Sequence, residues 1–83
     1  MDENKYNRLA EYETILHRAL YGNYSYCTRK EFDDIMEIDS NSYTEYTINK
    51  SAFTCNRCKL NELRKVAKKY FNYKDGKERR KIG

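Results

Sequence analysis

The stretch 54–73, TCNRCKLNELRKVAKKYFNY, decides the fold that the sequence predicts. Its apolar residues recur three and four positions apart, which places them on one face of a helix. We expect this helix to begin at Thr54, a good capping residue, and to end at about Tyr73, because Asp75 and Gly76 are typical of a helix break. Its predicted buried stripe consists of Cys55, Leu60, Leu63, Val66, Ala67, Tyr70 and Phe71.

An earlier helix is predicted over residues 2–21 by the same spacing, and Gly22 with Asn23 is a typical C-cap pair. A second helix is expected from Thr28 to about Ile38. Thr28 and Glu31 fit the capping-box pattern, in which each side chain accepts a hydrogen bond from the other residue's backbone N–H. The predicted core combines the three helices through Leu9, Tyr12, Leu16, Leu20, Phe32, Ile35, Met36, Leu63, Val66, Ala67 and Tyr70.

Residues 43–50 are rich in β-forming side chains, and Thr44, Tyr46 and Ile48 alternate with polar neighbours. An isolated strand is not stable alone. We therefore expect an extended, Tyr-rich connector or an edge strand between the second and third helices. The predicted fold class is mainly α, with a small three-helix domain over residues 1–74 and a basic C-terminal tail over residues 75–83.

The composition predicts a thin core. The chain has 83 residues with nine Tyr and three Phe, and fourteen of its residues are Leu, Ile, Val or Phe. Tyrosine can bury its ring while its hydroxyl stays hydrogen-bonded. A chain this small has little net stability from its core alone, so a metal, a partner chain or a homo-oligomeric assembly is a natural supplement.

The charges of the chain are divided between its two parts. Residues 1–54 carry six basic and ten acidic side chains, whereas residues 55–83 carry eleven basic and three acidic ones. This asymmetry predicts an acidic partner: nucleic acid, an acidic protein face, or the N-terminal part of a neighbouring copy. A solvated basic tail is the alternative. The candidate partner- or phosphate-binding residues are Arg57, Arg64, Lys65, Lys68, Lys69, Lys77, Arg79, Arg80 and Lys81.

Cys55 and Cys58 form a CxxC motif at the start of a predicted helix, where thiolates are favoured. With Cys27 and His17 they would complete a Cys₃His set for Zn²⁺. The motif also resembles superficially the redox motif of thioredoxin-like proteins, although the β-α-β scaffold of that fold is not predicted here. We expect no bound cofactor: the three cysteines are then small core side chains, and zinc is the alternative.

The sequence offers little to build a catalytic site. It has a single His, no Gly-rich phosphate loop and no Ser or Cys in a nucleophile-type turn, so we expect no enzymatic activity. No apolar run has the length of a membrane span, and residues 1–4 are acidic where a signal peptide would be basic. We therefore expect a protein that does not contact membranes and is not secreted.

The number of tyrosines exceeds what three short helices can bury, and exposed Tyr together with Arg is common in protein interfaces. The tyrosines in the predicted connectors are the best interface candidates, although they would instead cover the core if they fold inward. These residues are Tyr24, Tyr26, Tyr43 and Tyr46.

The layout of the chain resembles small proteins of tailed bacteriophages. The similarity lies in its Asn, Lys, Tyr and Ile content, in a first helix ending at 20–22 (Leu-Tyr-Gly), and in a CxxC helix that reaches Tyr70 and Phe71. Such proteins are commonly virion parts, packaged proteins or inhibitors of host defence. The resemblance implies a structural or protein-interaction role, in the virion or the host cytoplasm. The second hypothesis is a small nucleic-acid-binding protein, with or without stabilisation by the Cys₃His zinc site.

Overall fold

The computed structural model describes the backbone of residues 1–82 and the side chains of residues 1–78. Within this range the elements are all helical and no strand occurs, so the predicted mainly α class is confirmed. In chain order they are α1 (Glu3–Leu9), the 3₁₀ turn η1 (Ala10–Tyr12), α2 (Glu13–Gly22), α3 (Arg29–Asp39), α4 (Tyr43–Lys50), the 3₁₀ turn η2 (Ser51–Thr54) and α5 (Asn56–Ile82).

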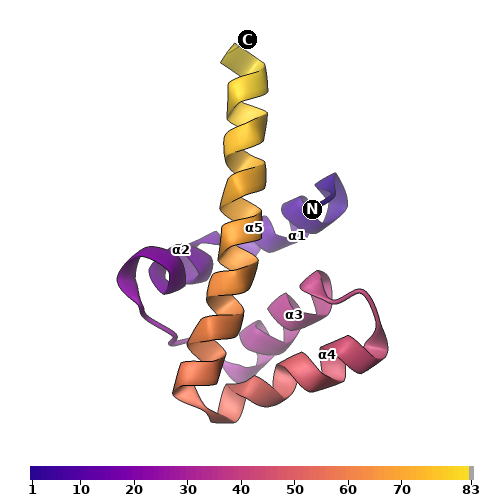
Figure 1. The fold of residues 1–83 in the computed structure, drawn as a ribbon, viewed down its shortest axis with the longest axis vertical. Helices are drawn as coiled ribbons and strands as arrows, with labels where there is room; N and C mark the ends of the chain where they lie inside the picture. The colour runs from indigo at the N-terminus through magenta and orange to yellow at the C-terminus, as the bar shows by residue number, and fades with distance from the viewer. Residues whose placement is uncertain (83) are drawn as a thin grey trace.

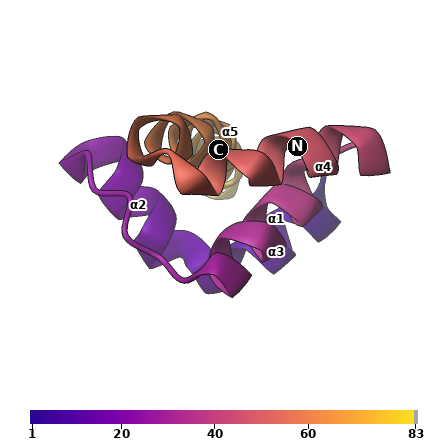
Figure 2. The same ribbon diagram turned by 90° about the horizontal axis from the view of Figure 1, so that it is seen from below.

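The long helix α5 runs along the longest axis of the molecule, and the shorter helices pack around it (Figure 1). α1 and α2 cross it near its middle, whereas α3 and α4 lie beside each other near its N-terminal end. Seen from below, α2 on one side and α1 with α3 on the other form a V under α5 (Figure 2). The core fills the space that these helices enclose.

The predicted first helix is bent rather than continuous. η1 separates α1 from α2, and at Tyr12 the backbone leaves helical geometry (φ −109°, ψ 15°). The bend allows α1 to pack on α3 while α2 packs on α5. It also brings the Tyr12 hydroxyl to Asp34 of α3, to which it donates a hydrogen bond of 2.7 Å.

The predicted caps around the second helix are confirmed. The Glu31 N–H donates to Thr28 Oγ1 at 3.1 Å, and the Thr28 N–H donates to Glu31 Oε1 at 2.8 Å, which is a capping box. Asn23 ends α2 in the left-handed conformation (φ 52°), which asparagine tolerates better than most residues. These caps are local, so the sequence is enough to specify them.

The prediction of a connector or edge strand at residues 43–50 is wrong, because this segment is the helix α4. Ser42 caps it by accepting the Glu45 N–H at 3.1 Å, and the Asn41 N–H donates to Glu45 Oε2 at 3.1 Å. Tyr46 packs against the core, as do Ala52 and Phe53 just beyond the helix. Tertiary packing and a cap therefore override the β-propensity of this segment. Over residues 1–82 the fold has four helical units, counting the bent α1–α2 as one, rather than three.

The start of α5 is one residue later than predicted. Cys55, not Thr54, occupies the capping position: its carbonyl accepts the Lys59 N–H at 2.8 Å and its sulfur accepts the Cys58 N–H at 3.4 Å. The Thr54 hydroxyl instead donates to the Ser51 carbonyl at 3.3 Å. The chain turns from η2 into α5 at this point.

The predicted end of this helix near Tyr73 is wrong, because α5 continues through Gly76 to Ile82. Glycine inside a helix costs about 1 kcal/mol relative to alanine. Contacts with α1 offset this cost: the Tyr73 hydroxyl donates to Glu3 at 2.7 Å, and Lys77 Nζ donates to Glu3 at 2.6 Å. Lys77 also lies over the Tyr6 ring at 4.8 Å. The helix thus gives no boundary at residue 75, and a separate role for residues 75–83 stays a prediction.

The predicted core is confirmed. Tyr12 and Leu20 pack at its edge, and the other predicted members are fully or almost fully buried. α2 and α5 form its main helix pair, and α3 closes it through Phe32, Ile35 and Met36. The structure adds four buried side chains, those of Ala19, Cys27, Ile38 and Lys59.

Candidate docking face on the long helix

Three basic side chains of α5 are neutralised within the fold. Lys69 pairs with Asp39 of α3 at 3.2 Å, Lys74 pairs with Glu13 of α2 at 2.7 Å, and the third is the Lys77–Glu3 pair already described. The acidic surplus of the N-terminal part therefore binds the basic α5 of the same chain. Two of the predicted partner-binding residues, Lys69 and Lys77, are occupied in this way.

These ion pairs shift the ionisation of their members. The pKa of Glu13 is lowered because Lys74 and Tyr70 donate hydrogen bonds to its carboxylate, and that of Glu3 is lowered in the same way by Lys77 and Tyr73. The pKa of Lys74 is raised in return by its hydrogen bond to Glu13. Both acids thus favour their charged form in the folded state, and the pairs hold α5 on α1 and α2 at neutral pH.

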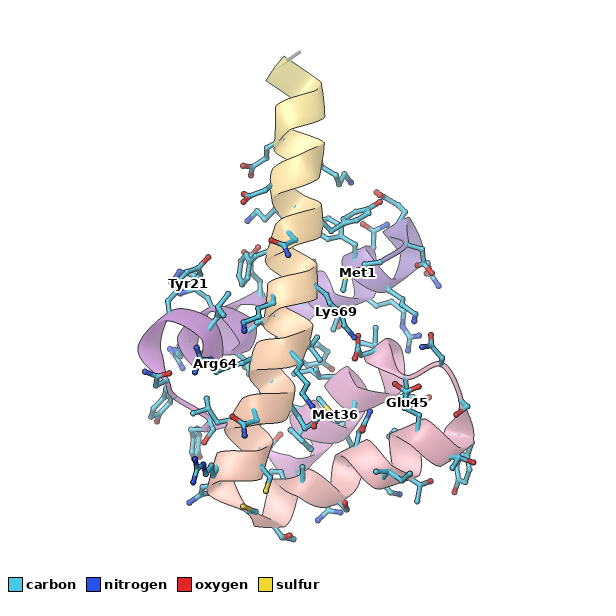
Figure 3. The ribbon with its side chains drawn as sticks, viewed as in Figure 1. Met1, Tyr21, Met36, Glu45, Arg64 and Lys69 are labelled. Atoms are coloured by element: carbon cyan, nitrogen blue, oxygen red, sulfur yellow. The ribbon has the colours of Figure 1, made fainter. Side chains whose placement is uncertain are left out.

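A second set of basic side chains faces away from the core. Residues 57, 61, 64, 65 and 68 recur at helical spacing, opposite the buried Leu63, Val66, Ala67 and Tyr70. We call this the outer face of α5, and it consists of Arg57, Asn61, Arg64, Lys65 and Lys68. Figure 3 shows Arg64 and Lys69 on opposite sides of the helix, which separates this set from the inward pairs.

The outer face keeps most of its positive charge. Arg57 and Lys68 are exposed and have no ion pair within the described side chains, whereas Lys65 contacts Glu62 on its own helix at 3.1 Å. Arg64 is half-buried, and its Nε finds no hydrogen-bond partner within the same range. A shallow hollow opens along the face, lined by Cys58, Asn61, Glu62, Arg64, Lys65 and Lys68. The predicted residues Arg79, Arg80 and Lys81 lie outside the described side chains.

Aromatic rings border the outer face on the side of α2. His17 and Tyr21 of α2 lie 4.8 Å apart between ring centroids, and Phe71 of α5 lies 6.0 Å from His17 and 5.9 Å from Tyr21. Tyr21 is 65% exposed, and in Figure 3 it lies on the same side of α5 as Arg64. We call these three residues the aromatic edge. The sequence analysis missed it, because a spacing along α2 does not reveal which rings α5 leaves uncovered.

The predicted interface tyrosines form two separate pairs. Tyr24 and Tyr26, 6.2 Å apart, are exposed in the connector between α2 and α3. Tyr43 and Tyr46, 6.1 Å apart, lie at the start of α4, where Tyr43 is 79% exposed and Tyr46 is half-buried under Lys50. The connector and the start of α4 lie on opposite sides of the molecule in both ribbon views (Figures 1 and 2). The four residues therefore do not form a common surface.

The predicted Cys₃His zinc site does not assemble. Cys27 is buried in the core, where burial raises its pKa. The expectation that all three cysteines are core side chains, with Cys55 in the buried stripe, is wrong, because Cys55 and Cys58 are exposed at the start of α5. His17 belongs to the aromatic edge. Across residues 1–78, no three His, Cys, Asp or Glu side chains gather in a way that could hold a metal ion. The prediction grouped His17 and Cys27 with the CxxC pair because of their residue types, not their spacing. In the fold, His17 and Cys27 pack away from the CxxC pair.

Asp33 and Asp34 of α3 have partners within the fold. Asp34 accepts the Tyr12 hydroxyl, and this hydrogen bond raises the pKa of Tyr12 to about 12. Asp33 forms an ion pair with Arg29 one turn earlier at 3.6 Å.

Among the described residues, every helix is too short or too polar to span a bilayer.

Comparison with known proteins identifies no relative. No protein-family model matches the chain, no curated protein is similar to its sequence, and no solved structure is similar to its fold.

Proposed function

We propose that this protein is a non-enzymatic interaction protein that docks on an acidic protein partner through the outer face of α5. One observation carries the proposal: Lys69, Lys74 and Lys77 of α5 are neutralised by acids of the same chain, while an outward row of positive charge remains at Arg57, Arg64 and Lys68. Charge that the fold does not use for itself is available to steer and orient a partner.

The aromatic edge favours a protein partner. Arg64 and Phe71 are seven residues apart and lie on the same side of α5, and the exposed Tyr21 ring continues this surface onto α2. Arginine and aromatic side chains provide much of the binding energy of protein interfaces, where rings are desolvated and guanidinium groups pair with carboxylates. The partner that fits is an acidic surface with an apolar side chain at its border.

The resemblance to small tailed-phage proteins supports a place for this docking in a phage virion or in the cytoplasm of the host. A minor virion component that binds an acidic neighbour, including another copy of the same chain, fits this reading. An inhibitor of a host protein would use the same surface.

Nucleic-acid binding is the second candidate. The observation that favours it is the spacing of Arg57, Arg64 and Lys68 over three turns of one helix face, since such a row can follow a phosphate backbone. This function predicts binding that depends steeply on salt and little on sequence.

The test compares two polyanions as probes, poly-L-glutamate and a random-sequence DNA duplex, by fluorescence anisotropy over a range of salt. The variant Arg57→Glu/Lys68→Glu changes the outer face. The control variant Arg8→Glu/Lys30→Glu makes the same change of net charge at exposed positions on α1 and α3. We expect the outer-face variant to weaken poly-L-glutamate binding about tenfold or more, the size expected for two charged contacts, and the control to change it little.

The outcomes separate the two functions. Tighter binding of the duplex, with a salt slope that falls by about two in the outer-face variant, would replace the protein partner by nucleic acid. Equal weakening by both variants would show that only net charge matters, and it would overturn docking at this face. Failure of the wild-type protein to bind either probe at low salt would overturn both functions.

A further inference from the structure

The first turn of α5 places two exposed thiols beside each other. Cys55 precedes the first helical residue, and the backbone N–H of Cys58 donates to its sulfur at 3.4 Å. Both residues are free and exposed, whereas the third cysteine, Cys27, is buried. This pair is neither part of the core nor part of the ion pairs that hold the fold together.

The two thiols are chemically unequal. The pKa of Cys55 is lowered because the thiol and the backbone N–H of Cys58 donate to its sulfur, and the charge and N–H of Arg57 add to this effect. The pKa of Cys58 is raised because it gives its hydrogen to Cys55. Helix N-termini and neighbouring cations favour thiolate in general. Cys55 is therefore the better nucleophile of the two, and Cys58 the thiol that retains its proton.

We propose that Cys55 and Cys58 form a redox modification site, which low-molecular-weight disulfides such as glutathione disulfide oxidise to an intrachain disulfide. The Cys55 thiolate attacks one sulfur of the oxidant, the S–S bond of the oxidant breaks, and one thiol is released. Cys58 then loses its proton and attacks the Cys55 sulfur, which releases the second thiol. The two cysteines lose two electrons and two protons, and one oxidant molecule becomes two thiols.

The surroundings favour this chemistry over a metal site. A structural zinc ion needs four ligands, and no third His, Cys, Asp or Glu joins this pair within the described residues. Exposure gives the oxidant access, and because neither side chain is buried, closing the disulfide costs no core packing. The backbone of Cys55 is extended (φ −116°, ψ 114°), so the bond would join the residue just before α5 to the first turn of that helix. This site does not depend on the proposed docking function.

The experiment treats the reduced full-length protein with glutathione disulfide and follows its mass. We expect a species that has lost two hydrogens and carries no glutathione. After the remaining thiols are alkylated, trypsin cleaves between the cysteines at Arg57, so the peptides 51–57 and 58–59 stay joined only where the disulfide exists. Reduction should separate them.

Variants and reagents assign the roles. Cys58→Ser should accumulate a glutathione adduct on Cys55, because the second thiol that completes the exchange is missing. Cys27→Ala should oxidise at the wild-type rate. In the wild-type protein at neutral pH, iodoacetamide should alkylate Cys55 at least about tenfold faster than Cys27, because the buried Cys27 thiol is both protonated and inaccessible.

Several results would overturn the proposal without any variant. These are a disulfide that includes Cys27, disulfide-linked dimers in place of the intrachain bond, or equal alkylation rates for the three thiols. Retention of both thiols in excess glutathione disulfide would also do so. If added Zn²⁺ protects both thiols from alkylation, and glutathione disulfide does not oxidise them without Zn²⁺, the pair is a metal-binding site instead.

Discussion

Gly76 provides a direct test of the long helix, because the fold and the sequence pattern predict opposite effects for Gly76→Ala. In the structure Gly76 is an interior residue of α5 with a negative φ, and a Cβ atom added there meets nothing within 4 Å. The substitution therefore adds no clash and removes only the conformational freedom that glycine has in the unfolded chain. If the helix ended at Gly76 in the left-handed conformation, alanine would be strained instead.

The expected gain follows from helix propensity. Alanine is favoured over glycine in a helix interior by about 0.8–1.0 kcal/mol. Since Tyr73 and Lys77 tie this turn to Glu3 of α1, the gain should appear in the global unfolding transition and not only in fraying of the helix end. For a domain of this size, about 1 kcal/mol corresponds to a rise in Tm of about 4–8 °C.

The measurement is thermal unfolding followed by far-UV circular dichroism, with urea unfolding as a second estimate of the free energy. Gly22→Ala is the matched control: Gly22 also has open space around it but is the last residue of α2, so the gain should be smaller. A fall in Tm for Gly76→Ala would refute the reasoning, because it would mean that the helix stops at this residue.

Two further predictions concern the contacts that hold α5 in place. Glu13→Gln should lower the free energy of unfolding by about 1 kcal/mol at pH 7, a value reduced for the partial exposure of the pair. The pKa of Glu13 in the folded state lies below its usual 4.5. The stability that the Glu13 carboxylate contributes is therefore complete above pH 4.5 and is lost as the pH falls through the lowered pKa. In urea unfolding, the free energies of wild type and variant should converge towards pH 3. Glu11→Gln, at an exposed position in η1, is the control and should change the free energy of unfolding little at pH 7. A constant difference between Glu13→Gln and wild type from pH 7 to 3 would contradict the linkage. Leu63→Ala should lower the free energy of unfolding by about 2–5 kcal/mol, because Leu63 is fully buried between helices. The control Ile48→Ala, at a 65% exposed position, should change it by less than about 0.5 kcal/mol. Comparable losses of stability for the two variants in urea unfolding would contradict the assigned core.

Parts of the docking face could be anticipated from the sequence and parts could not. From Leu60 to Phe71 the periodicity correctly separates a buried stripe from a basic one, because both follow from the geometry of a single helix. It is wrong in the first turn, where Cys55 is exposed and Lys59 is buried. It cannot show which basic residues beside the stripe find a partner within the fold. Only the tertiary structure brings Asp39, thirty residues away, to Lys69, while Lys68 stays exposed.

The sequence by itself determined the helical class, the core and the caps of α2 and α3. These features depend on spacing within one element, or on side chains that bind backbone groups three residues away, as at Thr28 and Glu31. Such interactions form wherever the local sequence permits them.

Only the tertiary structure decided that residues 43–50 are helical, that α5 passes through Gly76, and that Cys27 and His17 lie apart from the CxxC pair. Each of these outcomes depends on groups distant in the chain, as the Lys77–Glu3 contact across 74 residues illustrates. Local propensities differ by only about 1 kcal/mol per residue, and one well-placed long-range contact is of the same size. Where local propensities favour helix and other conformations about equally, the packing of the whole chain therefore decides which one forms.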